Sequence, residues 1–332
     1  MSVARSDLGL IVPVAKSLEA SGMSAPSSTQ LLTLRDGRRL CYAEYGAQRG
    51  LPVIFMHGLF GSRFQRHPNE AIARDLGVRL IVPERPGFGN SDFMPDRRLA
   101  DWPADVAQLI AALRLDTYAI AGISGGGPYA LACAAALEPA AVAVISGVGR
   151  IEKFNDGREV AWQQRLLFTL ARASGALARL PVGLMALGLR HDPQRFFAVL
   201  EASVSAQDRN ILQRPEVRAL LLKDMRTAMA QGARGLAHEV RILSRPWDIS
   251  LARIRCPVDV WHGTDDPWVP QRMAAALVQE LPQARLHWLK DAGHFLALDY
   301  WERILATLMG RLRAMPNNEA HTREHQSRAE QG

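Results

Sequence analysis

Short runs of mostly apolar residues recur along the middle of the chain, and stretches with helical spacing of apolar positions separate most of them. A run of this kind is typical of a strand that is buried on both faces of a sheet. Alternation of strands and helices predicts right-handed crossovers, and therefore an α/β fold with a mostly parallel sheet of about eight strands and helices on both faces. The expected strands are 52–56, 79–83, 118–123, 141–146, 258–262 and 285–289, and the expected helices are 70–76, 99–113, 128–137 and 271–281.

Two segments depart from this alternation. Residues 31–34 and 40–45 flank Asp36-Gly37, a turn pair that predicts a β-hairpin at the start of the sheet. Between the strands at 141–146 and 258–262 no good strand occurs, and the apolar spacing predicts helices at 160–173, 195–203, 216–230 and 233–243. Because this insert follows the carboxyl end of a strand, where open α/β sheets bind ligands, we expect it to form a lid over the site.

The chain should therefore consist of a core, a lid and two loose ends. We assign 29–149 and 248–314 to the α/β core and 150–247 to the helical lid. Residues 1–28 end in a Ser-, Gly- and Pro-containing stretch that is typical of a flexible arm, and 315–332 lack the apolar anchors of a folded segment. No apolar run reaches the roughly 18 residues that a membrane span needs, so we expect a cytoplasmic protein without a membrane span.

Composition and charge narrow the classes of partner. The net charge is +7, from 40 Lys and Arg against 33 Asp and Glu, but the basic residues are scattered singly or in pairs, which indicates a solvated surface and no nucleic-acid partner. Cys41, Cys133 and Cys256 are far apart and form no Cys/His cluster, so no metal site is expected. Because the glycine-rich segments match neither phosphate-binding pattern, no nucleotide or other cofactor is expected.

The strongest chemical signal is the segment Gly122-Ile-Ser124-Gly-Gly126. It matches the pattern G-x-S-x-G, follows an expected strand and opens an expected helix, which is the context that this pattern requires. Small flanking residues allow a sharp turn, so that the hydroxyl of Ser124 projects into the crevice and the amide of Gly125 points the same way. The sequence therefore predicts that Ser124 is a nucleophile.

A serine nucleophile needs a base and an acid behind it. His294 lies in the loop after the strand expected at 285–289, at the edge of the sheet where Ser124 is also expected, whereas most other histidines lie in the tail, the lid, a strand or beside a glycine. Asp265 and Asp266 both follow the strand at 258–262, between nucleophile and base in chain order. One of them would hold the imidazole and the other would form a turn before Pro267, and the residues alone leave the two assignments open.

Charge that develops on a substrate oxygen needs two backbone donors. The first is expected to be the amide of Gly125. The second should come from the loop His57-Gly-Leu-Phe-Gly-Ser62, with the amide of Leu59 preferred and that of Phe60 as the alternative.

With these segments in view, the chain over about 29–314 resembles the α/β-hydrolase superfamily. The resemblance implies that the acid is Asp266, because the family acid usually comes three residues after the glycine of the H-G-x-x-D segment. The Ser-Gly-Gly-Gly-Pro elbow resembles a bacterial branch without a defined substrate, and Ser124 argues against dehalogenases and epoxide hydrolases, which usually carry aspartate there. The motifs are His57-Gly58 with Gly61-Ser-Arg63, Pro83-Glu-Arg-Pro-Gly-Phe-Gly-Asn-Ser91, Gly122-Ile-Ser-Gly-Gly-Gly-Pro128, His262-Gly-Thr-Asp-Asp266 and Gly293-His294.

The expected activity is that of a serine hydrolase, a carboxylesterase that acts on small or apolar acyl esters through an acyl-enzyme. Two alternatives use the same fold: hydrolysis of another acyl bond (amide, lactone, thioester or carbon–carbon), or a non-catalytic ligand receptor. The presence of all three triad residues argues against the receptor. Aromatic residues of the lid fit either an apolar substrate or, by preference, ordinary helix packing: Trp162, Phe168, Phe196 and Phe197.

Overall fold

A computed structural model describes residues 29–153 and 162–314, so the arm predicted at 1–28 and the tail predicted at 315–332 lie outside the described residues. The described chain contains an eight-stranded sheet in the order β1-β2-β4-β3-β5-β6-β7-β8. This confirms the predicted α/β fold and the number of strands. The strands are β1 (Gln30–Thr33), β2 (Arg39–Gly46), β3 (Leu51–Met56), β4 (Val78–Pro83), β5 (Ala119–Ile123), β6 (Val142–Ile145), β7 (Val258–Gly263) and β8 (Ala284–Leu289).

Strand pairing follows the predicted pattern of one hairpin and a parallel core. β1 and β2 form the antiparallel hairpin, with Leu31 opposite Cys41, and β2 also runs antiparallel to β4. Every other neighbouring pair in the sheet is parallel. The carboxyl ends of β3, β5, β7 and β8 therefore meet at one edge, and the loops that follow them converge there.

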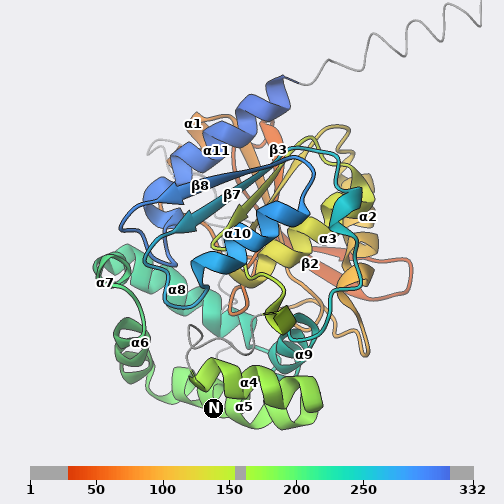
Figure 1. Cartoon of the computed structure of the whole chain (residues 1–332). Helices are drawn as coiled ribbons and strands as arrows, with labels where there is room; N and C mark the ends of the chain where they lie inside the picture. The colour runs from red at the N-terminus through yellow and green to blue at the C-terminus, as the bar shows by residue number, and fades with distance from the viewer. Residues whose placement is uncertain (1–28, 154–161, 315–332) are drawn as a thin grey trace, which may run out of the picture.

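Apolar layers cover both faces of the sheet, which explains why the strand sequences are apolar throughout. In β3, Ile54 and Met56 face one layer, and Val53 and Phe55 face the other. The first layer packs α2, α3 and α10 against the sheet, and the second packs α1 and α11 (Figure 1). These helices are α1 (Ala71–Asp75), α2 (Trp102–Leu113), α3 (Gly127–Leu137), α10 (Gln271–Glu280) and α11 (Ala297–Arg313).

The long segment between β6 and β7 is helical, as predicted. Its helices lie together below the sheet in the view of Figure 1. All of them except α7 contribute to an apolar cluster that includes Ala178, Val182, Leu236 and Val240. Phe88, from the loop after β4, joins this cluster and so connects the insert to the core. The helices are α4 (Trp162–Ala173), α5 (Gly175–His191), α6 (Pro193–Ala202), α7 (Ala206–Leu212), α8 (Pro215–Ala228) and α9 (Ala233–Leu243).

Helices α5 and α7 were not predicted from the sequence. α5 carries Pro181 in its interior together with Gly183 and Gly188, and these residues are the poorest helix formers. Ser174 starts the helix all the same, because its side chain accepts a hydrogen bond from the amide of Ala176. Packing of its apolar face in the insert cluster therefore outweighs the unfavourable local propensity.

Within 29–153 and 162–314, no helix is both long and apolar enough to cross a membrane.

Candidate active site

Ser124 occupies the sharp turn between β5 and α3. Its φ is +52°, in the left-handed region that non-glycine residues seldom adopt. The flanking glycines make this turn possible, since a Cβ on Gly122 would lie 2.4 Å from the carbonyl oxygen of Gly126, and a Cβ on Gly126 would lie 2.1 Å from that of Met56. The close approach of the backbones therefore requires the glycine pattern from which Ser124 was predicted.

A chain of hydrogen bonds links Ser124 to the two other predicted triad residues. The Oγ of Ser124 lies 3.0 Å from Nε2 of His294, and Nδ1 of His294 lies 2.8 Å from Oδ2 of Asp266. Oδ1 of Asp266 accepts hydrogen bonds from the amides of Trp268 (2.9 Å) and Val269 (3.0 Å), which fix the carboxylate. Because the carboxylate accepts the proton on Nδ1, Nε2 is free to accept the proton of the serine hydroxyl.

Asp266 and His294 each stabilise the charged form of the other. Burial alone would lower the pKa of His294, but the carboxylates of Asp266 and Asp208 hold it above its ordinary value. Burial would likewise raise the pKa of Asp266, but the neighbouring imidazolium form of His294 keeps it below its ordinary value. The pair therefore favours an ionised Asp266 beside an imidazole that accepts a proton readily.

The second acid candidate does not reach the histidine. Asp265 is exposed, and its carboxylate accepts a hydrogen bond from the hydroxyl of Thr264 (3.1 Å). Asp266, and not Asp265, contacts His294. The geometry thus agrees with the assignment that the family resemblance implied.

The two predicted oxyanion donors lie beside each other. A Cβ on Gly125 would lie 3.1 Å from the amide nitrogen of Leu59, so the two amides come from adjacent stretches of backbone. The loop that carries Leu59 is held by Arg85, whose guanidinium donates to the carbonyl oxygens of His57 (2.5 Å) and Gly58 (3.0 Å). Phe60, the alternative donor, lines the neighbouring pocket. The geometry favours Leu59, and its role as a donor to substrate stays a prediction.

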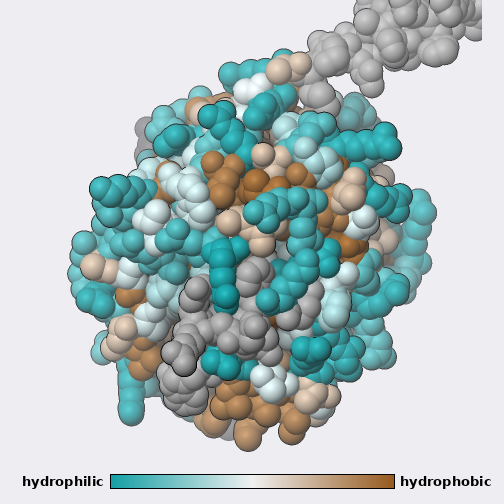
Figure 2. Space-filling view, in the orientation of Figure 1, coloured by the Kyte–Doolittle hydropathy of each residue, from teal (hydrophilic) through white to brown (hydrophobic). Residues whose placement is uncertain are grey.

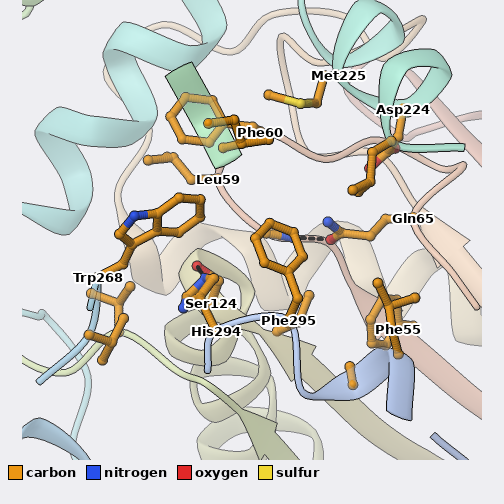
Figure 3. A pocket seen from close by; sticks show the side chains of 18 of the residues that line it. Phe55, Leu59, Phe60, Gln65, Ser124, Asp224, Met225, Trp268, His294 and Phe295 are labelled. Carbon is orange, nitrogen blue, oxygen red and sulfur yellow. Dashed lines mark hydrogen bonds between the residues drawn. The ribbon is translucent and has the colours of Figure 1, made fainter. Parts of the chain in front are cut away.

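A mostly apolar pocket opens beside Ser124 (Figure 3). In the view of Figure 3, Ser124 and His294 lie side by side with Leu59 and Phe60 above them. The cavity measures about 170 Å³, and both the core and the insert line it. Its apolar lining includes Phe55, Leu59, Phe60, Ile123, Phe168, Leu200, Leu221, Met225, Leu243, Trp268, Phe295 and Leu298.

Of the aromatic residues singled out in the insert, one lines the pocket and two pack between helices. Phe168 of α4 lines the pocket. Phe196 packs among the insert helices, and Phe197 is fully buried beneath the guanidinium of Arg218. The side chain of Trp162 lies outside the described residues.

Buried carboxylates from the insert, which sequence reasoning missed, contact the loops around Ser124. On α9, Glu239 accepts hydrogen bonds from Arg85 (2.5 Å), Arg97 and the hydroxyl of Tyr129 (3.0 Å). All four side chains are buried. Glu239 therefore neutralises the arginine that holds the Leu59 loop.

Two aspartates make similar contacts. On α8, Oδ1 of Asp224 accepts from the amide (2.7 Å) and the hydroxyl (2.6 Å) of Ser62, at the end of the Leu59 loop. On α7, Asp208 accepts from the amides of His294 (2.7 Å) and Phe295 (2.9 Å). The sequence carries only a weak signal for these residues, namely single acidic positions among the apolar positions of amphipathic helices.

Comparison with known proteins places this chain in a family. A sequence model described as the alpha/beta hydrolase fold matches residues 52–299. The chain is 34% identical over 113 residues to a non-heme chloroperoxidase of Streptomyces lividans (34% of this chain, 41% of that protein) and 36% identical over 110 residues to Lipase 1 of Psychrobacter immobilis (31% and 33%). It thus spans less than half the length of these two relatives.

Solved structures agree on the fold. A thermophilic esterase from Thermogutta terrifontis superposes with a TM-score of 0.62 at 22% identity, covering 86% of this chain and 98% of that one. An alpha/beta hydrolase fold protein from Nakamurella multipartita gives 0.63 at 22% identity, covering 86% and 99%. Because the family match spans most of the described core, the chain belongs to the α/β-hydrolase fold family.

Proposed function

We propose that this protein is a serine hydrolase that cleaves small or apolar acyl esters, with Ser124, His294 and Asp266 as its catalytic triad. The observation that carries this proposal is the chain of contacts from Ser124 Oγ to His294 Nε2 (3.0 Å) and from His294 Nδ1 to Asp266 Oδ2 (2.8 Å) at an apolar pocket. A serine, an imidazole and a carboxylate in this order form an activated nucleophile.

The proposed cycle has two halves. Ser124 Oγ attacks the ester carbonyl carbon while His294 Nε2 takes the hydroxyl proton, and the amides of Gly125 and Leu59 stabilise the oxyanion. The carbon–oxygen bond to the alcohol then breaks, and His294 returns the proton to the departing alcohol. Water attacks the acyl-enzyme with His294 again as the base, which releases the carboxylic acid and restores the hydroxyl of Ser124. Asp266 keeps the imidazole in the required tautomer throughout.

The pocket supports a small or apolar acyl group. A cavity of about 170 Å³ is close to the size that binds a benzene-sized ligand, and its mostly apolar lining favours hydrocarbon. Residues 150–247 would act as the lid, since Gln164 and Phe168 of α4 and Leu221 and Met225 of α8 close this pocket. A lipase and an esterase are among the similar proteins, which supports ester hydrolysis.

Covalent labelling tests the proposal directly. The protein would be incubated with a fluorophosphonate probe, digested and analysed by mass spectrometry, in parallel with turnover of p-nitrophenyl butyrate. We expect one adduct, on Ser124, and loss of turnover in proportion to labelling. A folded protein that stays unlabelled at Ser124 would support the non-catalytic receptor. Labelling without ester turnover would redirect the assignment to another acyl bond.

A further inference from the structure

Asp208 holds the backbone of the proposed base from the side of the insert. The residue is fully buried, with Oδ2 accepting from the amide of His294 (2.7 Å) and Oδ1 from the amide of Phe295 (2.9 Å). Gly293 makes this approach possible, because a Cβ there would lie 2.0 Å from Oδ2 of Asp208. The hydroxyl of Ser205 accepts from the amide of Asp208 (3.1 Å) and so caps the helix that carries it.

The core holds the other side of the same residue. Ser146, after β6, donates its hydroxyl proton to the carbonyl oxygen of His294 (3.0 Å). The ring of Trp268 packs 4.8 Å from the imidazole, and its Nε1 donates to the carbonyl oxygen of Ser203, between α6 and α7 (3.0 Å). The peptide groups on both sides of His294 and one face of its ring are therefore fixed. The insert supplies the acceptor for the amides of His294 and Phe295, through Asp208.

We infer that Asp208 is a positioning residue for His294 in the proposed ester hydrolysis, acting through the two amides and through its charge. The inference rests on the proposed function. The charged or titratable groups that act on the imidazole are Asp266 on the loop after β7, Asp208 on α7 and His262 at the end of β7. Asp266 and Asp208 both stabilise the imidazolium that forms when Ser124 loses its proton.

Replacing Asp208 with asparagine tests this role by kinetics and by titration. The variant keeps one oxygen acceptor but turns an N–H group toward one of the two amides and removes the charge. In the wild type, kcat/KM for p-nitrophenyl butyrate should rise with pH as His294 loses its proton. In Asp208→Asn this rise of kcat/KM, the ascending limb of the pH profile, should move to lower pH by about one unit. We also expect kcat to fall about tenfold or more, with KM nearly unchanged.

Asp192→Asn is the matched control, because Asp192 is an exposed aspartate of the same insert that caps α6 through the amide of Arg195 (2.9 Å). Asp192→Asn should leave both kcat and the pH dependence of kcat/KM at the wild-type values. Gly293→Ala is a second variant that displaces the carboxylate without removing its charge, and it should lower kcat with a smaller shift of the limb.

NMR titration of ¹⁵N-labelled histidine measures the pKa of His294 without any substrate. A lower pKa in Asp208→Asn without ester turnover in the wild type would uphold this inference and refute the proposed function. A folded Asp208→Asn with the wild-type pKa and kcat, or a folded Gly293→Ala with wild-type kcat, would overturn the inference.

A separate feature of the insert is an exposed apolar face on α5. Its leucines are three or four residues apart and so lie on one side of the helix, opposite the buried Ala178, Val182 and Leu189. Figure 2 shows apolar residues at the lower end of the molecule, where Figure 1 places α4 and α5. The exposed fractions are 51% for Leu177, 71% for Leu180, 62% for Leu184 and 53% for Leu187.

Within α4 and α5 the charged residues have one sign. α4 and α5 contain no acidic residue, whereas they carry Arg165, Arg172, Arg179 and Arg190. On a helical wheel, Arg179 and Arg190 fall beside the leucines of α5. Two copies of this face packed together would bring these arginines close to each other, without acidic partners from α4 or α5. A leucine face bordered on one side by arginines fits a surface that is both apolar and anionic.

We propose that the α5 leucine face docks on anionic lipid. Sedimentation with vesicles is the test: the full chain should bind vesicles of phosphatidylglycerol and phosphatidylcholine, bind weakly to phosphatidylcholine alone, and be released by salt. The double variants Leu180→Gln with Leu184→Gln, and Arg179→Gln with Arg190→Gln, should each weaken binding by about tenfold or more. Leu31→Gln, on the exposed β1 leucine (55%), is the control and should bind as the wild type does.

Three results would overturn the proposal. The first is a wild type that does not sediment with the anionic vesicles. The second is binding that the leucine variants leave unchanged. The third is a dimer in light scattering that Leu180→Gln with Leu184→Gln dissociates, because the face would then belong to a second copy.

Discussion

Replacing Ser124 with alanine is expected to lower kcat for p-nitrophenyl butyrate by about 10⁵- to 10⁶-fold and to leave KM nearly unchanged. The loss is large because the variant has no hydroxyl for His294 to activate, so that the acyl-enzyme route closes entirely. The amides of Gly125 and Leu59 would remain, and they account for the residual rate above that in water. Steady-state and single-turnover kinetics measure the change.

The Ser124 variant needs a control for the substitution itself. Ser250→Ala alters an exposed serine before β7 and should keep the wild-type kcat. The backbone of Ser124 has a positive φ, which alanine tolerates about as well as serine, so the fold should be retained. A Ser124→Ala protein that hydrolyses the ester at the wild-type rate would refute the triad.

Replacing Asp266 with asparagine should reduce kcat by about 10⁴-fold. The Oδ1 atom of the asparagine still accepts from the amides of Trp268 and Val269, so the loop keeps its shape. The amide NH₂ group, however, faces Nδ1 of His294 and donates to it. The imidazole proton then moves to Nε2, which can no longer accept the proton of Ser124.

Asp265→Asn is a matched control for this second variant, because it makes the same chemical change at the preceding, exposed position. We expect it to keep kcat within about twofold of the wild type, since surface substitutions of this kind have small effects. The pair of variants is compared by kcat on p-nitrophenyl butyrate and by thermal unfolding. Equal losses of kcat in both variants would show that the acid was assigned wrongly.

Features that depend on local sequence were predictable, and the elbow shows why. Gly122 and Gly126 are needed because backbone oxygen atoms lie too close for any side chain, so the geometry leaves a fixed pattern in the sequence. The buried strands were found from their apolar runs and the hairpin from its Asp36-Gly37 turn, because these signals are also local. The candidate base His294 could be found from its place after the last strand.

Features that depend on distant contacts were not predictable. Asp208 and His294 are 86 residues apart, and nothing in the short helix α7 distinguishes this aspartate from a solvated one. Asp265 and Asp266 could not be separated by local chemistry, because only the direction of each side chain in the folded loop decides which one meets the imidazole. α5 was missed because its proline and glycines lower helix propensity, whereas the packing that stabilises it comes from other helices of the insert.

The contact between Glu239 and Arg85 limits how this protein could be recombined with its relatives. Both side chains are fully buried, and Arg85 also carries the hydrogen bonds that shape the Leu59 loop. A chimera whose new insert lacked a carboxylate at the position of Glu239 would leave the Arg85 guanidinium in the core without its counter-ion, at a cost of about 3 to 5 kcal/mol. An exchange of specificity by grafting a new insert would therefore have to carry the glutamate of α9 along.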